Sequence, residues 1–260
     1  MFPAALIFNA DGTISETDEI HRRAFNLAFR DLNLSWHWSQ SVFSRLINTL
    51  TSQAKILTFV QNYRPEEAFK LEDGGLLKST IERKNEHYLN MIEAGAATLR
   101  PGVSRLIKEA RIADVKLAIV SLAGRRDFEC VLQNHFGIGA LSMFDAITTV
   151  EDIDVSENPR SNMSAVYTRT LEKIGVSADD TFAIEAREPG TEAARNLGLN
   201  VIATPGLYTS SGRFQAADLV LSDLGHPAAP FQVIRGRAGA HHFVSVEALG
   251  RWTTQLAGAA

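Results

Sequence analysis

A short polar turn follows an apolar run near the start of the sequence. The run AALIF (residues 4–8) leads directly into NADGT (residues 9–13). An aspartate at the end of a buried strand can serve as a general acid or base, and a catalytic signature of this kind would carry a second carboxylate two residues earlier. That earlier position is Asn9, which is neutral. Asp11 therefore has two interpretations: a working acid–base residue, or a turn residue whose side chain bonds nearby backbone amides.

Polar residues also stand at the ends of later apolar runs. Ser121 follows VKLAIV (115–120), where it is placed either to bind an anion at the N-terminus of the next helix or to cap that helix. Glu185 ends the run TFAIE (181–185). The Arg125–Arg126 pair is either a source of cationic charge near a phosphate or a surface pair. The acidic stretch 151–157 is either a metal site or a solvated loop.

The elements that would position these side chains alternate along the chain. Continuous apolar runs indicate strands buried on both faces, at 4–8, 115–120, 146–150, 181–185, 200–204 and 219–222. Amphipathic patterns between them indicate helices, at 103–112, 128–136, 164–175 and 190–198. This alternation predicts an α/β fold with a doubly wound parallel sheet, whose functional sites lie beyond the carboxyl ends of the strands.

Residues 15–97 break the alternation, because they contain amphipathic helical patterns and no good strand candidate. The sequence therefore predicts an α/β core made of residues 1–14 and 98–260, with an α-helical cap (15–97) inserted after the first strand. The junctions near 14–17 and 94–98 are expected to act as hinges. Trp36 and Trp38 are expected to hold the cap helices together.

The composition of the chain argues against several classes of protein. The chain has 260 residues and a net charge of −4, from 26 basic and 30 acidic residues, so we expect no nucleic-acid binding. No apolar run approaches about 18 residues, and no signal peptide is recognised, so no membrane association is expected. Cys130 is the single cysteine, which excludes an internal disulfide and fits a reducing, cytoplasmic location; we expect it to be a buried thiol.

Several segments resemble the haloacid dehalogenase-like (HAD) phosphohydrolases, and more closely the CbbY group of sugar-phosphate phosphatases, relatives of β-phosphoglucomutase. The segments are DGTISETDEIHRRAFN (11–26), RKNEHYLNMIEAGAATLRPGVSRLIKEAR (83–111), KLAIVS (116–121), FAIE (182–185), VIATPGLYT (201–209) and LVLSDLG (219–225). The resemblance covers nearly the whole chain. It implies a HAD-like, Rossmannoid core with a helical cap, in agreement with the element pattern.

The resemblance also assigns catalytic positions. The family's nucleophile is an aspartate that ends the first strand and becomes an aspartyl phosphate, and that position is Asn9 here. The proton-handling aspartate corresponds to Asp11, and the hydroxyl that holds the phosphoryl oxygens corresponds to Ser121. The family's lysine stands before a proline, and the residue before Pro159 is Asn158. An amide is a very poor nucleophile, and the phosphate would lose a neutralising cation.

The implied Mg²⁺ site is altered as well. By resemblance its positions are Asn9, Asp11, Glu185 and Ala186, and the family's aspartate is missing at Ala186. Mg²⁺ prefers hard oxygen ligands and gives up water reluctantly, so binding is expected to be weak or absent.

Substrate contacts are implied near the first junction. Glu16, His21 and Arg22 match the family there, and Ser121 would hold the phosphoryl group. His21 and Arg22 have a second interpretation, a solvated helix face. The family's Thr-Gly-Gly-Lys turn in the cap is absent, because the corresponding run 50–53 is LTSQ.

Three hypotheses follow. The leading one is a CbbY-like pseudophosphatase that has lost catalysis and binds a small phosphorylated sugar or a protein partner. The second is a Mg²⁺-dependent sugar-phosphate phosphatase of the xylulose-1,5-bisphosphate type, working with an altered active site. The third is a non-catalytic interaction module. Turnover with a metal requirement separates the first two, and thermal stabilisation by sugar phosphates separates the first from the third.

Overall fold

The larger part of the protein is built on one twisted sheet. The computed structural model describes residues 2–49, 51–122, 124–154 and 159–257. Seven strands lie in the order β3-β2-β1-β4-β5-β6-β7. They are β1 (Ala5–Asn9), β2 (Lys116–Val120), β3 (Ala146–Thr148), β4 (Thr181–Glu185), β5 (Asn200–Ala203), β6 (Leu219–Leu221) and β7 (Val233–Arg235). All neighbours pair in parallel except β6 and β7, which are antiparallel.

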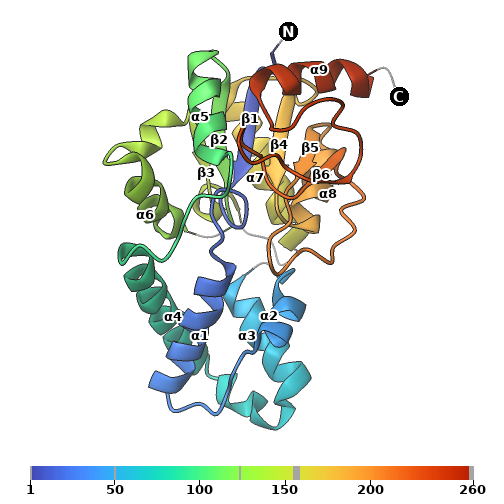
Figure 1. Cartoon of the computed structure of the whole chain (residues 1–260). Coiled ribbons are helices and arrows are strands. Elements are labelled where there is room, and N and C mark those ends of the chain that lie inside the picture. The colour runs from blue at the N-terminus through green and yellow to red at the C-terminus, as the bar shows by residue number, and fades with distance from the viewer. Residues whose placement is uncertain (1, 50, 123, 155–158, 258–260) are drawn as a thin grey trace. The chain divides into compact units, whose positions relative to one another are not determined.

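Helices cover the sheet on both faces (Figure 1). One face packs against α5 (Val103–Ile112), α6 (Arg125–Phe136) and α9 (Val246–Ala257) in a continuous hydrophobic core. The strands are contacted from the opposite face by α7 (Pro159–Ile174) and α8 (Glu188–Asn196). Short 3-10 helices, Ala140–Met143 and Val150–Asp152, flank β3. The predicted α/β fold with a doubly wound, mainly parallel sheet is confirmed.

Side chains along β1 and β4 alternate between the two faces of the sheet. This alternation determines which side chains lie next to each other at the carboxyl ends of these strands. Leu6 and Phe8 belong to the core shared with α5 and α6. Successive strand residues point to opposite faces, so Asn9 points to the face covered by α7 and α8. Phe8 pairs in register with Ile184. The next residue of each strand, Asn9 and Glu185, therefore lie side by side on that same face.

The sequence missed two elements at the C-terminal side. The edge strand β7 is exposed throughout, and its three residues are too short a run to show a period. The helix α9 was not assigned, although Val246, Leu249 and Trp252 are buried along one side of it. Cys130 was expected to be buried, but its position on α6 leaves it partly exposed.

Residues 17–97 form a second compact unit, and residues 1–16 with 98–260 form the first. The first boundary lies two residues after the predicted 14/15 junction. The described elements of the second unit are helical: α1 (Asp18–Asp31), α2 (Gln40–Leu46), α3 (Ser52–Tyr63), a 3-10 helix (Pro65–Leu71) and α4 (Gly75–Glu93). That this unit works as a cap with hinges stays a prediction.

An aromatic cluster forms the centre of this helical unit. Trp38 is fully buried and lies against the rings of Phe25, Phe29, Phe43 and Phe59 at centroid distances of 4.3 to 5.9 Å. These rings come from α1, α2 and α3, so the segment that carries Trp38 joins three helices. The expected role of this tryptophan is confirmed. Among the described helices, none has the length and apolar character needed to cross a membrane.

Candidate functional site

The turn after β1 fixes the orientation of Asn9. Gly12 adopts a φ of 77°, which favours glycine, and its N–H donates to the carbonyl of Ser15 at 3.0 Å. The backbone N–H of Asp11 donates to Oδ1 of Asn9 at 3.2 Å. Because the amide oxygen accepts this bond, the amide nitrogen of Asn9 faces the other way, toward β4.

A buried hydrogen-bond network joins three elements at this point. Nδ2 of Asn9 donates to both carboxylate oxygens of Glu185, at 3.1 and 2.9 Å. The hydroxyl of Tyr167, on α7, donates to Oε1 of the same carboxylate at 2.6 Å. The backbone N–H of Ala186 donates to Oε2 at 3.3 Å. Both oxygens of Glu185 therefore accept from donors supplied by the protein itself.

Burial dominates the electrostatics of this network. Glu185 and Tyr167 have no exposed surface, and Asn9 is 8% exposed. Burial raises the pKa of Glu185 to about 7, although hydrogen bonds from Tyr167 and Asn9 and the positive charge of Arg187 act in the opposite direction. Burial and the neighbouring carboxylate raise the pKa of the Tyr167 hydroxyl. The carboxyl thus holds its proton more readily than an exposed glutamate.

The α8 helix leaves room for this carboxylate at a glycine. A Cβ added to Gly190 would overlap the carboxylate of Glu185. Ala186, where the family resemblance implies an aspartate, is buried and presents only a methyl group. Across the described ranges, no group of three or more His, Cys, Asp and Glu side chains is arranged to hold a metal ion.

Ser121 follows β2 and is completely buried, with its backbone N–H bonded to the carbonyl of Thr148 at 3.0 Å. The capping interpretation of Ser121 is wrong, because α6 begins at Arg125 and its N-cap is Gly124, without a side-chain cap bond. The serine lies too early in the loop to occupy that position. Its role toward an anion stays a prediction.

Glu16 is placed in the first unit by contacts with the loop after β5. Its Oε1 accepts the N–H of Leu207 at 2.8 Å, and its carboxylate occupies the space next to Gly206, where a Cβ would overlap it. Arg100 holds the same region together: it donates to the carbonyls of Gly12, Thr204, Pro205 and Ser222. The turn after β1 is thereby tied to the loops that follow β5 and β6.

His21 and Arg22 belong to the helical unit and have partners there. The His21 ring stacks on Tyr88 at a centroid distance of 4.1 Å. Arg22 donates to both carboxylate oxygens of Glu19, at 2.9 and 2.6 Å, and to the carbonyl of Trp38 at 2.7 Å. Neither residue is a merely solvated part of the helix face. Their expected contact with a phosphate stays a prediction.

The remaining expectations have different outcomes. Asn158 and Glu157 lie outside the described residues. Within the acidic stretch, Asp152 bonds the Thr149 N–H at 2.8 Å and Lys173 at 2.8 Å, so its charge is used in a local cap and an ion pair. The Arg125–Arg126 pair is exposed in the first turn of α6.

Sequence reasoning missed Tyr167, Gly190 and Arg100. Tyr167 falls within a helical pattern in which it looks like one more core residue, and Gly190 looks like an ordinary helix-start glycine. No local signal identifies them, because their contacts depend on how separate elements pack. Tyr167 on α7 and Gly190 on α8 both contact Glu185 at the end of β4, and Arg100 bonds to three separate loops. The positions of Asn9 and Glu185 at strand ends were the sequence features that pointed to this place.

Comparisons with known proteins agree with this architecture. The profile of the haloacid dehalogenase-like hydrolases matches residues 6–204. The plasmid-encoded protein CbbY of Cupriavidus necator is 35% identical over 253 residues, which cover 95% of this chain and 96% of that protein. The protein CbbY of Cereibacter sphaeroides is 31% identical over 84% of this chain and 90% of its own length.

Solved structures give the same result. The crystal structure of CbbY from Rhodobacter sphaeroides in complex with phosphate has a TM-score of 0.75 and 30% identity, covering 85% of this chain and 94% of that one. An Asp-to-Asn mutant of the same protein, in complex with xylulose-(1,5)bisphosphate, has a TM-score of 0.76 and 29% identity, covering 87% and 98%. On the strength of its sequence, its sheet and these relatives, the chain belongs to the haloacid dehalogenase-like hydrolase family, in the CbbY-like group.

Proposed function

We propose that this protein is a CbbY-like HAD protein that has lost phosphatase activity and keeps a ligand-binding scaffold. One observation carries the proposal: the side chain at the nucleophile position is the amide of Asn9, and it donates to both oxygens of Glu185. The lone pair of an amide nitrogen is delocalised into the carbonyl group, and the amide oxygen carries no negative charge, so Asn9 is a very poor nucleophile and lacks the carboxylate that forms the family's covalent intermediate.

The residues present do not fit Mg²⁺, the metal that the family generally uses. A magnesium ion needs oxygen lone pairs directed toward it, usually from carboxylates. Here the Glu185 oxygens accept from Asn9, Tyr167 and the Ala186 N–H, and the neighbouring side chain is a methyl group. These donors occupy the positions from which a cation would approach the carboxylate. We therefore infer that Mg²⁺ binds weakly or not at all.

A sugar phosphate is the ligand that the relatives favour. The solved Asp-to-Asn mutant of CbbY holds xylulose-(1,5)bisphosphate, so one such replacement is compatible with bisphosphate binding in that protein. In this chain, Ser121, Asp11 and Glu16 stand at the carboxyl ends of the strands or just beyond them, where ligands bind in such sheets. A protein partner is the other ligand class that this scaffold could serve.

The test is phosphate release from a panel of sugar mono- and bisphosphates, xylulose 1,5-bisphosphate included, with Mg²⁺ present. We expect no release by the native protein. The triple variant Asn9→Asp, Asn158→Lys, Ala186→Asp should gain activity that EDTA abolishes. The matched control is Asn158→Lys, Ala186→Asp, which restores charge without the nucleophile and should stay inactive. Native turnover that EDTA abolishes would overturn the proposal.

The alternative is a Mg²⁺-dependent phosphatase with an altered active site. Its support is the 35% identity to CbbY of Cupriavidus necator over almost the full length of both proteins. If the native protein releases phosphate, the candidate nucleophiles are Asp11 and Glu185, and the variants Asp11→Asn and Glu185→Gln would tell them apart.

A further inference from the structure

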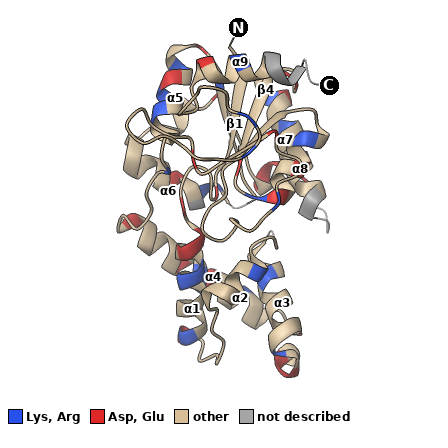
Figure 2. Ribbon diagram, turned by 45° about the vertical axis from the view of Figure 1, so that its right-hand side comes forward, with Lys and Arg blue, Asp and Glu red and all other residues tan. Residues whose placement is uncertain are grey.

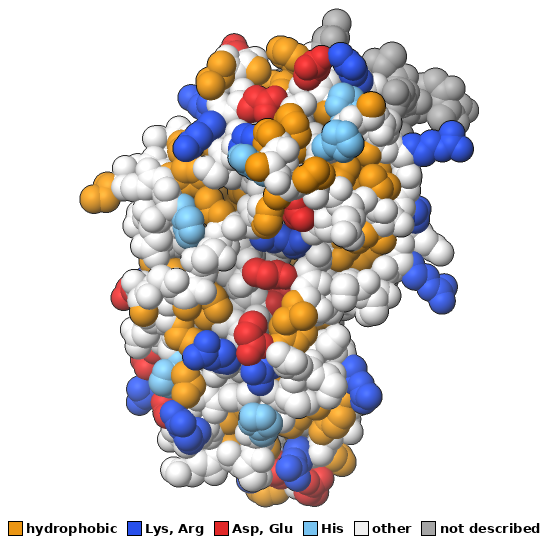
Figure 3. Space-filling model, in the orientation of Figure 1, with side chains coloured by type: hydrophobic (Ala, Val, Ile, Leu, Met, Phe, Trp, Pro, Cys, Tyr) orange, Lys and Arg blue, Asp and Glu red, His pale blue; other side chains and the backbone are white. Residues whose placement is uncertain are grey.

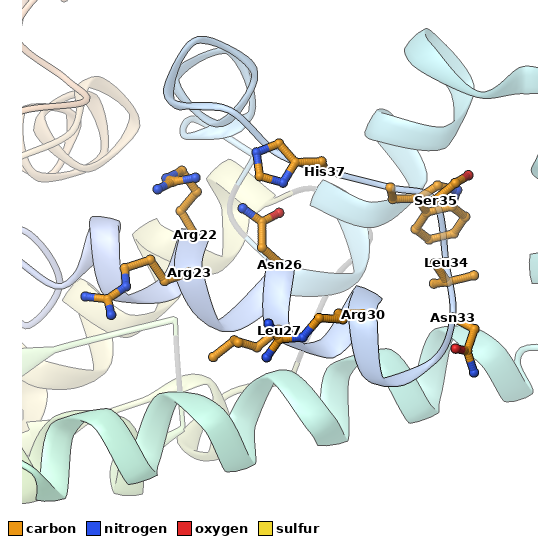
Figure 4. A pocket seen from close by; sticks show the side chains of 10 residues that line it. Arg22, Arg23, Asn26, Leu27, Arg30, Asn33, Leu34, Ser35 and His37 are labelled. Carbon is orange, nitrogen blue, oxygen red and sulfur yellow. The ribbon is translucent and has the colours of Figure 1, made fainter.

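A groove in the helical unit is lined by three arginines and a histidine. Its volume is about 720 Å³, and its lining includes Arg22, Arg23, Arg30, Leu27, Trp36 and His37 (Figure 4). Small-molecule sites generally have volumes of about 300 to 1,000 Å³. The groove is therefore large enough for a metabolite, and every residue that lines it lies between 22 and 37, within the second unit.

The geometry of α1 sets the spacing of the charges. Arg23, Leu27 and Arg30 are separated by four and three residues, so they share one side of the helix. With a rise of about 1.5 Å per residue, the backbones at Arg23 and Arg30 lie about 10 Å apart. Figure 2 marks Lys and Arg residues along this helix, and Figure 3 shows Lys, Arg and His side chains on the visible face of the helical unit.

The opposite wall of the groove, residues 33–37, is held in place before any ligand arrives. The next residue, Trp38, donates its N–H to Oδ1 of Asn26 at 2.8 Å, and its carbonyl accepts from Asn26 at 2.9 Å and from Arg22 at 2.7 Å. The Trp36 ring is 3% exposed, and its Nε1–H donates to Glu67 at 3.1 Å. A wall fixed in this way reduces the entropy cost of binding.

The groove carries positive charge that its own lining does not neutralise. None of its lining residues carries a carboxylate. Arg22 is neutralised by Glu19, and Asp31, the neighbour of Arg30, is bonded to His87 at 2.6 Å. Arg23 and Arg30 are exposed, and within the described part of the chain no ion pair or hydrogen bond involves either guanidinium group. Two guanidinium groups are therefore available to a ligand.

We propose that this groove binds a small organic anion that carries two phosphate groups, with Arg23 and Arg30 as the two phosphate contacts. Arginine presents a planar fork of donors that matches a phosphate group. Leu27 lies between the two arginines on the same side of α1 and offers apolar surface, which suits the carbon skeleton of such a ligand. The lining of the groove is confined to residues 22–37, which favours a small molecule over an extended acidic peptide. This site does not depend on the function proposed for the β1 and β4 strand ends.

The experiment is calorimetric titration without added Mg²⁺, with fructose 1,6-bisphosphate as the probe and fructose 6-phosphate as the singly charged comparison. The double variant Arg23→Gln, Arg30→Gln should bind the bisphosphate at least tenfold more weakly than the native protein. The matched control removes two exposed cations from α4 of the same unit, as Lys78→Gln, Arg83→Gln, and should change the affinity less than twofold. The monophosphate should bind the native protein at least tenfold more weakly.

Hydrogen–deuterium exchange locates the ligand. Protection of residues 22–37 on adding the bisphosphate is the expected result. Protection confined to residues 9–16 and 121–122 would place the ligand in the first unit and overturn the proposal. No binding, equal weakening in both double variants, or binding of a poly-glutamate peptide in place of the bisphosphate would overturn it as well. The variant Arg23→Lys, Arg30→Lys keeps the charge and should bind with an intermediate affinity.

Discussion

The amide nitrogen of Asn9 lies 3.1 and 2.9 Å from the two carboxylate oxygens of Glu185, and it donates to both. The two residues are 176 positions apart in the sequence and meet because β1 and β4 are adjacent parallel strands. Tyr167 adds a third donor bond at 2.6 Å. The arrangement satisfies a buried carboxyl group with the protein's own donors, and four predictions follow from its geometry.

Replacing Asn9 with aspartate should destabilise the protein at pH 8 in EDTA. The substitution removes the two bonds to Glu185 and places two buried carboxylates within contact distance, which disfavours ionisation of both. We expect a loss of about 2 kcal/mol or more in the free energy of unfolding, measured with urea. At pH 5 this loss in the free energy of unfolding should be smaller, because one of the two carboxyl groups is then protonated. Equal deficits at both pH values would contradict this account.

Removal of the Tyr167 hydroxyl tests how much its hydrogen bond to Glu185 stabilises the protein. Tyr167→Phe leaves Glu185 with one hydrogen bond fewer in a fully buried site, and a bond to a charged group contributes about 1.5 to 3 kcal/mol. We expect a loss in this range at pH 8 from urea unfolding. Tyr63→Phe is the matched control, because its hydroxyl lies in an exposed contact with Arg45 and its removal should cost little. Similar losses in both variants would argue against a special role for Tyr167.

The raised pKa of Glu185 predicts a pH dependence of stability. The folded protein holds this proton up to about pH 7, whereas the ordinary pKa of a glutamate is 4.5, so the folded state binds more protons than the unfolded state between these limits. Stability from this group is complete below the unfolded pKa and is lost as pH rises toward 7, by about 3 kcal/mol in total. Glu185→Gln removes the titration, so its stability should fall less between pH 4.5 and 7.5. Parallel profiles for the two proteins would contradict the assignment.

The glycine beside Glu185 should resist substitution. A methyl group at Gly190 would overlap the Glu185 carboxylate, which cannot move without breaking its bonds to Asn9 and Tyr167. Although alanine favours a helix by about 1 kcal/mol over glycine, we expect Gly190→Ala to be net destabilising by about 1 to 3 kcal/mol. At Gly75, which begins α4, an added Cβ meets only ordinary contacts, so Gly75→Ala should be neutral or stabilising. Thermal unfolding of both variants provides the comparison.

Much of the architecture followed from local patterns. The apolar run at 181–185 coincides with β4, and the amphipathic pattern at 103–112 coincides with α5, because burial on both strand faces and a single helix face each leave a periodic signature. The start of α7 was placed five residues too late, because its first turn, from Pro159, has few apolar residues. The exposed strand β7 has no such signature at all.

The sequence by itself determined which side chains stand at the strand ends: Asn9, Ser121 and Glu185, with alanine at 186. Residue type was enough to show that the nucleophile position holds an amide. Only the tertiary structure decided what these residues contact. The bonds from Asn9 and Tyr167 to Glu185, the fit of the Glu185 carboxylate against Gly190 and the bond from Arg22 to the carbonyl of Trp38 depend on side-chain direction and on the approach of separate elements. Local propensity carries no information about such distant contacts, because they arise from the register of neighbouring strands and from the packing of helices across them.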